Sequence, residues 1–319
     1  MMLSRVASHL YWLSRYLERA ENMARILDVG QSLGLLSGRS GDEDLAIEPL
    51  VITEMLTAFK AAGKPATHEN VARFMAWDPS HPSSIANCLE ASRENARAVR
   101  GSITSEMWEN INDTWLQLAN RRRTRGETID LEFFEWVKER SHLFRGVTFA
   151  TIRRDQPYLF IRLGTFLERA DNTARILSVK QAGAEEEGNE ANGSGAAADV
   201  VTDYYRLSAV LRSVSSLEAY RDTYRDAIEA RRVAELLIFN PKLPRSLRFC
   251  FDEIDRILRD LPEQAGKQAR RMAATIYARL AYGELEEVYA YGLQNFVERF
   301  LRDNTRLGEA VHGAYLEMK

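Results

Sequence analysis

Apolar residues near the start of the chain recur at the spacing of one face of an α-helix. Successive members of this stripe are alternately four and three positions apart, as on a helix that packs against a second helix. The members are Leu13, Leu17, Ala20, Ala24 and Leu27. Ser4 is suited to cap the first turn. The pattern predicts a long helix over about residues 4–31.

Further helical segments follow, and prolines mark several of their ends. Asp155 and Pro157 predict the start of a second long helix that reaches about residue 181. Short helices should stop before Pro79 and Pro241, because proline cannot continue a helix. The other predicted helices cover approximately residues 48–62, 70–77, 130–145, 202–226, 231–239 and 285–302, with one more after each of the prolines at 82 and 244.

The chain also repeats itself at long range. Residues 13–29 match residues 163–179 at eleven of seventeen positions without a gap, at an offset of 150. A second block, residues 71–89, matches residues 233–251 at an offset of 162, and it includes two prolines and a cysteine. Such self-similarity over a fixed period is typical of duplicated structural units.

The repeat defines the expected architecture. The offset grows by twelve because the second copy carries a longer loop, residues 183–198, which is rich in Gly, Ala and Glu and is expected to be flexible. Only residues 147–152 have a β-like composition, and that run is short. We therefore predict an all-α fold of two tandem related helical repeats, residues 1–150 and 151–319, packed as one helical bundle-like body.

Composition narrows the classes of partner. Hydrophobic residues make up 45% and charged residues 28% of the chain, as in soluble globular proteins. With 43 Lys and Arg against 46 Asp and Glu, the chain lacks the basic excess of a nucleic-acid or membrane-surface binder. The N-terminal segment does not resemble a signal peptide, and two cysteines cannot form a disulfide framework. We expect a cytoplasmic protein.

A polar stripe accompanies the apolar one on the repeated helix. Glu18, Asn22 and Arg25 follow one another at i, i+4 and i+7. The second copy repeats the stripe with Glu168, Asn172 and Arg175. One interpretation is a polar pocket where the copies meet, holding a carboxylate-, amine- or phosphate-bearing group. The other is a Glu–Asn–Arg network that fixes how the two helices pair.

Each copy carries a Glu-Arg pair whose glutamate belongs to this stripe, Glu18-Arg19 in residues 10–22 and Glu168-Arg169 in residues 160–172. This pattern resembles the bacterial alpha-E domain family, and residues 93–112 and 244–250 are similar to it as well. The resemblance covers nearly the whole chain. It implies an all-helical, tandemly duplicated domain with an ER motif, and it marks both Glu-Arg pairs as motif residues without assigning them chemistry.

The resemblance also implies a function. The family suggests an auxiliary, scaffolding or substrate-binding component of an ATP-grasp-dependent peptide synthesis or modification system. Its expected partners are circularly permuted ATP-grasp ligases, transglutaminase-like proteins and an NTN-type peptidase. The chain has no P-loop, Rossmann fingerprint or nucleophile elbow, so we expect no cofactor of its own and expect another protein to bind ATP.

Downstream of the repeated helix the two copies differ. One basic helix face that could hold a carboxylate or phosphate consists of Arg93, Arg97 and Arg100. The second copy replaces it with Asp255, Arg259 and Pro262. It also replaces three candidate residues of the first copy, namely Glu106, Trp108 and Asn112. We expect any ligand surface mainly on the first copy; the alternative is a solvated face paired with Glu90 and Glu94.

An enzymatic alternative comes from two Glu-x-x-His pairs. Together with Glu18 and Glu168 they reproduce the ligand set of a carboxylate-bridged di-metal bundle. The pairs are Glu139 with His142 and Glu309 with His312. They are offset by 170 rather than 162, so His142 aligns with Asn304 and a metal site is not favoured. An enzyme with a di-metal or a Glu/Arg site acting on a peptide or amino acid stays the second hypothesis.

Two smaller features complete the set of candidates. Cys88 and Cys250 occupy matching places amid apolar neighbours and are expected to be buried structural thiols. The basic run over residues 121–125 is expected to be a solvated loop between helices.

Overall fold

The computed structural model describes residues 2–37, 43–187 and 196–317, without the side chains of residues 33–44, 179–203 and 263–264. Regular structure in these residues consists of fifteen α-helices, one 3-10 turn and one π-helical turn, with no strand. The predicted all-α fold is therefore confirmed. Among the same residues, no helix combines the length and the apolar character that a membrane span needs.

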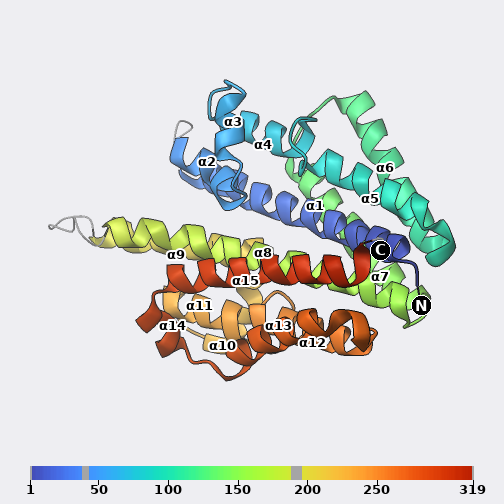
Figure 1. The fold of residues 1–319 in the computed structure, drawn as a ribbon. Coiled ribbons are helices and arrows are strands. Elements are labelled where there is room, and N and C mark those ends of the chain that lie inside the picture. Colours follow the sequence, from blue (N-terminus) through green and yellow to red (C-terminus); the bar gives the residue numbers. More distant parts are fainter. Residues whose placement is uncertain (1, 38–42, 188–195, 318–319) are drawn as a thin grey trace.

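The first half of the chain forms seven helices, of which α1 is the longest. They are α1 (Ser4–Ser37), α2 (Glu43–Ile52), α3 (Leu56–Ala61), α4 (His68–Trp77), α5 (Ile85–Ala98), α6 (Ser105–Arg125) and α7 (Leu131–Thr151). Helices α2 to α6 lie above α1 in Figure 1, and α1 contacts α2, α4, α5 and α7. The helices of this layer thus pack on α1.

The second half forms the lower layer of Figure 1. Its helices are α8 (Gln156–Glu187), α9 (Ala196–Ser213), α10 (Leu217–Tyr224), α11 (Ala230–Phe239), α12 (Leu247–Asp260), α13 (Glu263–Tyr282), α14 (Leu285–Tyr291) and α15 (Leu293–Val311). Gly292 separates the last two helices with a φ of +89°, a conformation that favours glycine. The π-helical turn His312–Leu316 returns to contact α1.

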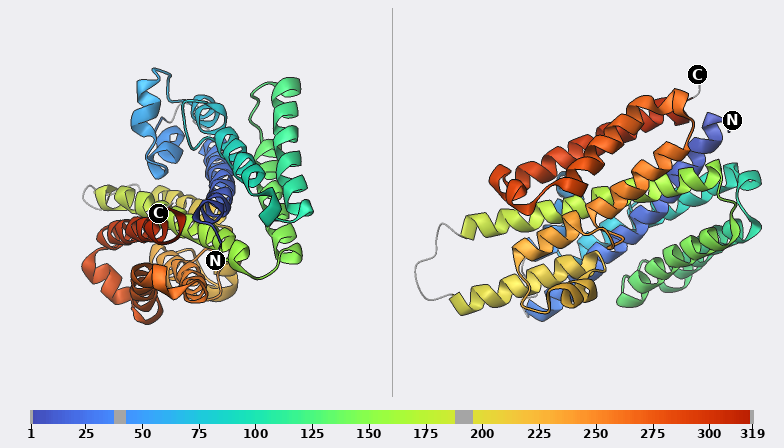
Figure 2. Two further views of the ribbon diagram at one scale, coloured as in Figure 1. Left: turned by 45° about the vertical axis from the view of Figure 1, so that its right-hand side comes forward. Right: turned by 90° about the horizontal axis from the view of Figure 1, so that it is seen from below.

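The two layers meet through α1 and α8, which lie side by side in the middle of the molecule (Figure 2). Gly164 marks their closest approach: a Cβ there would lie 2.3 Å from the backbone oxygen of Tyr11. Only a residue without a side chain fits at that distance. Ala20 and Ala170, which hold matching places on the two helices, are both fully buried. Sequence thus determines how near the two halves can come.

Local structure recurs between the halves. Helices α4 and α11 end at Asp78 and Asn240, whose side-chain oxygens each accept a backbone N–H two residues later, at 2.9 and 2.8 Å. Ser84 and Ser246 then cap α5 and α12. These matches sit at the offset of 162 that the sequence repeat has. The tandem duplication and its boundaries at residues 150 and 151 remain our interpretation of the sequence.

The turns after α2 and α9 also correspond, at an offset of 161. The backbone N–H of Glu54 donates to Val51 at 3.1 Å, and that of Ser215 donates to Arg212 at 3.0 Å. Both turns put a residue with a side chain at positive φ, +59° for Glu54 and +51° for Ser215. Glu54 and Ser215 therefore hold equivalent places in the two halves.

Two local expectations were wrong. The loop predicted over residues 183–198 is shorter, because α8 continues to Glu187 and α9 starts at Ala196; residues 188–195 lie outside the described residues. The basic run 121–125 forms the end of α6 and not a loop. The β-like run 147–152, where we expected no strand, lies mostly in α7. Ala, Glu and Arg are strong helix formers, and neighbouring helices override the weak β preference of a short run.

Candidate functional site

The two Glu-Arg pairs of the repeated helices bind each other across the α1–α8 contact. Nε and Nη2 of Arg19 donate to the two carboxylate oxygens of Glu168 at 2.5 and 3.0 Å. Nε and Nη2 of Arg169 donate to Glu18 at 2.8 and 3.0 Å. Each motif thus supplies the carboxylate of one bidentate ion pair and the guanidinium of the other. We call these four residues the ER clamp.

The ion pair formed by Glu168 belongs to a small cluster that lies close to solvent. A second arginine, Arg15, donates to Oε2 of Glu168 at 2.7 Å, and Arg19 also reaches Ser83 at 3.2 Å. The side chains of Arg15 and Arg19 are 17% and 26% exposed. Burial acts to raise the pKa of Glu168, but the two guanidinium groups outweigh it and lower that pKa to about 2. We call Glu168, Arg15 and Arg19 the Glu168 centre.

The ion pair formed by Glu18 belongs to a larger cluster. Four guanidinium groups surround two buried carboxylates, an excess of two positive charges, and a histidine adjoins them. The members of this Glu18 centre are Glu18, Glu21, Arg25, His142, Arg145, Arg169 and Arg245. Arg145 bridges the carboxylates, at 2.9 Å from Glu18 and 2.5 Å from Glu21. Arg245 lies 3.2 Å from Glu18 and 2.7 Å from Glu21.

Burial and charge compete in the Glu18 centre. Burial acts to raise the pKa of both carboxyl groups, but the surrounding arginines outweigh it and hold both pKa values below the ordinary range. Arg245 shows the reverse balance, because burial dominates and lowers its pKa to about 10. Both carboxylates and Arg245 are therefore charged at neutral pH. Neither Glu18 nor Glu21 is suited to exchange a proton with a substrate there.

Sequence reasoning missed several members of both centres, among them Arg15, Glu21, Arg145 and Arg245. The signals were indirect. Glu21 lies inside the repeated block but is Asp171 in the second copy, and Arg245 stands where the first copy has Ser83. A charged residue beside the N-cap of a buried helix is unusual. That substitution could have pointed to a buried ionic partner.

The remaining stripe residues are Asn22, Arg25, Asn172 and Arg175. Asn22 accepts from Arg245 at 2.8 Å, and the side-chain nitrogens of Asn22 and Asn172 have no partner among the described residues. Arg175 pairs with Asp171 at 2.6 Å and with Glu54 at 2.8 Å. We call Arg175, Asp171 and Glu54 the Arg175 triad. Arg25 and Arg175 thus reach the turns after α9 and α2 rather than each other.

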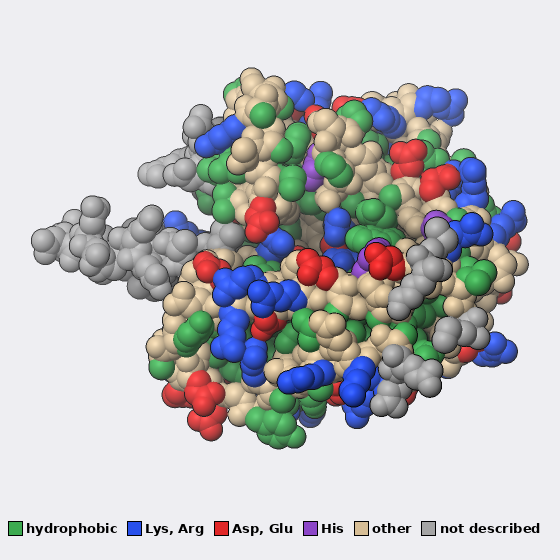
Figure 3. Space-filling model, in the orientation of Figure 1, with side chains coloured by type: hydrophobic (Ala, Val, Ile, Leu, Met, Phe, Trp, Pro, Cys, Tyr) green, Lys and Arg blue, Asp and Glu red, His purple; other side chains and the backbone are tan. Residues whose placement is uncertain are grey.

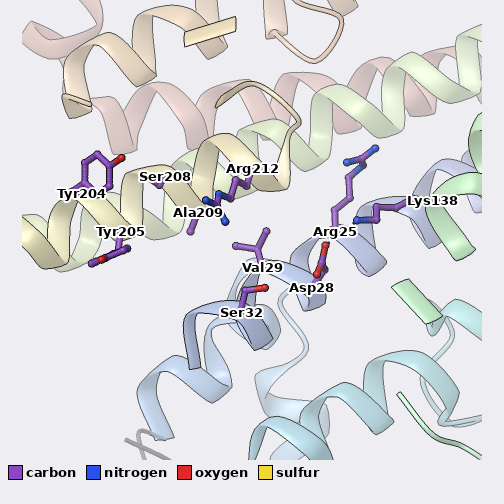
Figure 4. A pocket seen from close by; sticks show the side chains of 10 residues that line it. All are labelled: Arg25, Asp28, Val29, Ser32, Lys138, Tyr204, Tyr205, Ser208, Ala209 and Arg212. Carbon is purple, nitrogen blue, oxygen red and sulfur yellow. Dashed lines mark hydrogen bonds and ion pairs between the residues drawn. The ribbon is translucent and has the colours of Figure 1, made fainter. Parts of the chain in front are cut away.

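Arg25 connects the Glu18 centre to a cavity of about 270 Å³ between α1, α7 and α9, which we call the α9 pocket (Figure 4). Arg25, Asp28 and Lys138 lie on one side, and the residues of α9 lie on the other. The lining comprises Arg25, Asp28, Val29, Ser32, Lys138, Tyr204, Tyr205, Ser208, Ala209 and Arg212. Three cationic side chains against one carboxylate make this cavity suited to an anion.

Other hollows carry a more even charge. The face shown in Figure 3 is hollowed along the seam between the layers, where side chains of both signs gather. A separate hollow of about 610 Å³ between α1, α2 and α4 includes Glu69, Arg73 and Glu127 in its lining. Neither feature combines a positive excess with contact to the Glu18 centre. The α9 pocket is therefore the candidate site that we develop.

The basic face predicted on α5 is mostly occupied by internal contacts. Arg93 donates to Asn112 at 2.9 Å and to Glu94 at 2.8 Å, and Arg97 lies 3.4 Å from Glu94. The guanidinium of Arg100 lies 5.0 Å from the ring centre of Trp108, and Glu106 is exposed. These residues connect α5 to α6 and lie apart from the ER clamp.

The residues of the di-metal hypothesis do not come together. Glu18 and Glu168 are held by arginines, and Glu139, Glu309 and His312 are exposed. His142 lies 3.5 Å from Glu21 and adjoins Arg25 instead. Among the residues that the structure describes, no three His, Cys, Asp or Glu side chains form a group able to hold a metal ion.

Both cysteines are fully buried, as expected, and free. Burial raises the pKa of Cys88 and of Cys250 to about 12, although Arg19 lies near the first thiol and Arg169 near the second. At neutral pH both are protonated thiols, which are weak nucleophiles. Both thiols therefore contribute to packing next to the ER clamp.

Known proteins carry the same sequence pattern. A family model described as a predicted alpha-helical domain with a conserved ER motif matches residues 2–316. Uncharacterized proteins of Mycobacterium bovis and Mycobacterium tuberculosis are 28% identical over 91% of this chain. The chain spans about a third of the length of these curated relatives, 34%. No solved structure matches it. Because the family model covers nearly every residue, the chain belongs to the Alpha-E domain family.

Proposed function

We propose that this chain is an auxiliary component that binds or scaffolds a substrate in an ATP-grasp-dependent peptide synthesis or modification system. The observation that carries the proposal is the α9 pocket, where α1 and α7 of the first half meet α9 of the second and bring three cationic side chains together. A peptide offers carboxylates to such a surface, together with backbone groups for hydroxyl side chains to bind.

The state of the ER clamp supports a binding role. All four clamp side chains are engaged with one another, and their carboxylates stay ionised at neutral pH. A network of this kind fixes the relation of two helices, so that the residues beside it are held in place. The network fixes the position of Arg25 in particular, because Arg25 belongs to the Glu18 centre and also lines the α9 pocket.

The length of the relatives also supports a role alongside other proteins. The matched region makes up 34% of the mycobacterial relatives, so in them this domain is joined to further sequence. A domain that is joined to further sequence in its relatives is expected to work together with other protein units. The partners we propose are a circularly permuted ATP-grasp ligase and a transglutaminase-like protein, as the family resemblance implies.

Complex formation tests the proposal. The purified chain is mixed at micromolar concentration with the circularly permuted ATP-grasp protein of the same genome, and in parallel with an unrelated ATP-grasp enzyme. Size-exclusion chromatography with light scattering should show a stoichiometric complex with the first protein only. Separate elution from the proposed partner, and from the transglutaminase-like protein as well, would contradict the proposed role.

A further inference from the structure

The ligand class of the α9 pocket can be inferred by comparing it with the Arg175 triad. Arg25 on α1 and Arg175 on α8 hold matching places in the repeated helix. Each arginine reaches the equivalent turn of the other half. Nη1 of Arg175 lies 2.8 Å from a carboxylate oxygen of Glu54, whereas Nη1 of Arg25 donates to the hydroxyl of Ser215 at 2.6 Å. A neutral hydroxyl therefore stands where the other half has a carboxylate.

The helix before each turn changes charge in the same direction. Val51 on α2 corresponds to Arg212 on α9, and Glu48 corresponds to Ala209. Arg212 is exposed and has no ion pair with any residue that the structure describes. At these positions the α9 side has thus lost two carboxylates and gained a guanidinium, although on the repeated helix it carries Asp28 where the other copy has Ser178. The difference favours an external anion at the α9 pocket.

A second observation comes from inside the pocket. Ser208 is only 7% exposed, and its hydroxyl has no hydrogen-bond partner among the described residues. A buried hydroxyl without a partner is costly unless a ligand or water satisfies it. Arg25 and Lys138, each 9% exposed, line the same cavity. Lys138 pairs with Asp28 at 2.8 Å and also with Glu135 at 2.5 Å, so the carboxylate in the lining is itself paired with a cation.

We propose that the α9 pocket binds the terminal carboxylate of a peptide, placed between Arg25 and Arg212 and accepting a hydrogen bond from Ser208. The ligand carboxylate takes the part for Arg25 that Glu54 takes for Arg175. A cavity of about 270 Å³ lies below the usual size of sites for drug-sized molecules, roughly 300–1,000 Å³, so it admits a single terminal residue. The half-exposed rings of Tyr204 and Tyr205 then contact the preceding residue.

That the ligand is a peptide rests on the proposed function, whereas the carboxylate site itself is tested on the isolated chain. The probes are N-acetyl-alanyl-alanine with a free carboxylate and the same dipeptide with a terminal amide, titrated by calorimetry. We expect the acid to bind at least tenfold more tightly than the amide. Equal affinities, or no binding of the acid, would overturn the proposal, and tighter binding of inorganic phosphate would replace it with a phosphate site.

Two matched variants make the test specific. Ser215→Glu places a carboxylate beside Arg25, and Glu54 at φ +59° shows that this turn accommodates glutamate. It should weaken binding of the acid at least tenfold, as should Arg212→Ala. Glu54→Ser makes the opposite change in the Arg175 triad and should leave binding unchanged. Undiminished binding by a folded Ser215→Glu variant would contradict the assignment.

The two proposals can fail separately. Binding of the acid without any complex with the ATP-grasp protein would uphold the carboxylate site and refute the proposed system. A complex without binding of the acid would do the opposite. Circular dichroism of each variant shows that a loss of binding does not come from unfolding.

Discussion

The Glu18 centre and the Glu168 centre start from the same dipeptide and become different environments. In the Glu168 centre one carboxylate meets two arginines that reach the surface. In the Glu18 centre two carboxylates are buried among four guanidinium groups, and Arg25 extends the cluster to the α9 pocket. The repeated motif thus builds the contact between the halves, and the residues around it decide which side offers a ligand site.

The largest difference is expected for removal of the two clamp carboxylates. Glu18→Gln leaves Arg169 and Arg245 buried without full compensation, and we expect it to lower the free energy of unfolding by about 3–5 kcal/mol. Glu168→Gln leaves arginines that can turn to water, so its cost should be about 1–3 kcal/mol. Urea unfolding of both variants measures the difference. Equal costs, or a larger cost for Glu168→Gln, would contradict the contrast.

A second comparison concerns the closest approach of α1 and α8. Gly164→Ala adds a Cβ that would lie 2.3 Å from a backbone oxygen, so the helices must separate, at a cost of about 1–3 kcal/mol. Ser14 holds the matching place on α1, and its hydroxyl donates to Tyr11 at 2.9 Å. The control Ser14→Ala should cost at most about 1 kcal/mol. A milder effect of Gly164→Ala in thermal unfolding would show that the contact is looser than described.

The pH dependence of stability should differ between the sides because His81 corresponds to Leu243. His81 is buried and stacks on Phe74, and burial lowers its pKa to about 4. The unfolded chain takes up a proton near pH 6.5 and the folded chain does not. Stability is thus complete above pH 6.5 and falls as the pH drops towards 4, by at most about 1.4 kcal/mol per pH unit.

His81→Leu should remove this dependence and raise the free energy of unfolding by up to about 2 kcal/mol at pH 5. Urea unfolding of variant and parent at pH 5 and pH 7.5 measures it. The gain should be smaller at pH 7.5, where the unfolded histidine is also neutral. An equal gain at both values would mean that packing, not protonation, distinguishes the two positions.

Sequence patterns predicted the elements well because their determinants are local. Apolar periodicity located α1 and α8, and the prolines at 79 and 241 located the ends of α4 and α11 within a residue. One of the two interpretations of the polar stripe was a Glu–Asn–Arg network that fixes how the repeated helices pair, but it did not pair Glu18 with Arg169 or Glu168 with Arg19. Periodicity places Glu18, Asn22 and Arg25 on one face, but it does not say which residue of the other helix each one meets.

The rest of the site depends on contacts between distant segments. Arg145 and Arg245 reach Glu18 from α7 and from the start of α12, and no local pattern relates these positions. The α9 pocket requires α9 to lie against α1 and α7. Its sequence signal, the change from Val51 to Arg212 and from Glu54 to Ser215, becomes visible only once the two turns are superimposed.

The central claim, that each Glu-Arg motif binds the motif of the other half, is tested most directly by double-mutant cycles in urea unfolding. The pairs Glu18 with Arg169 and Glu168 with Arg19 should each show a coupling energy above about 1 kcal/mol. Glu18 with Arg19, which are neighbours in sequence but not partners, should couple more weakly. Coupling below about 0.5 kcal/mol in both cross-half pairs, the value for independent sites, would contradict the ER clamp.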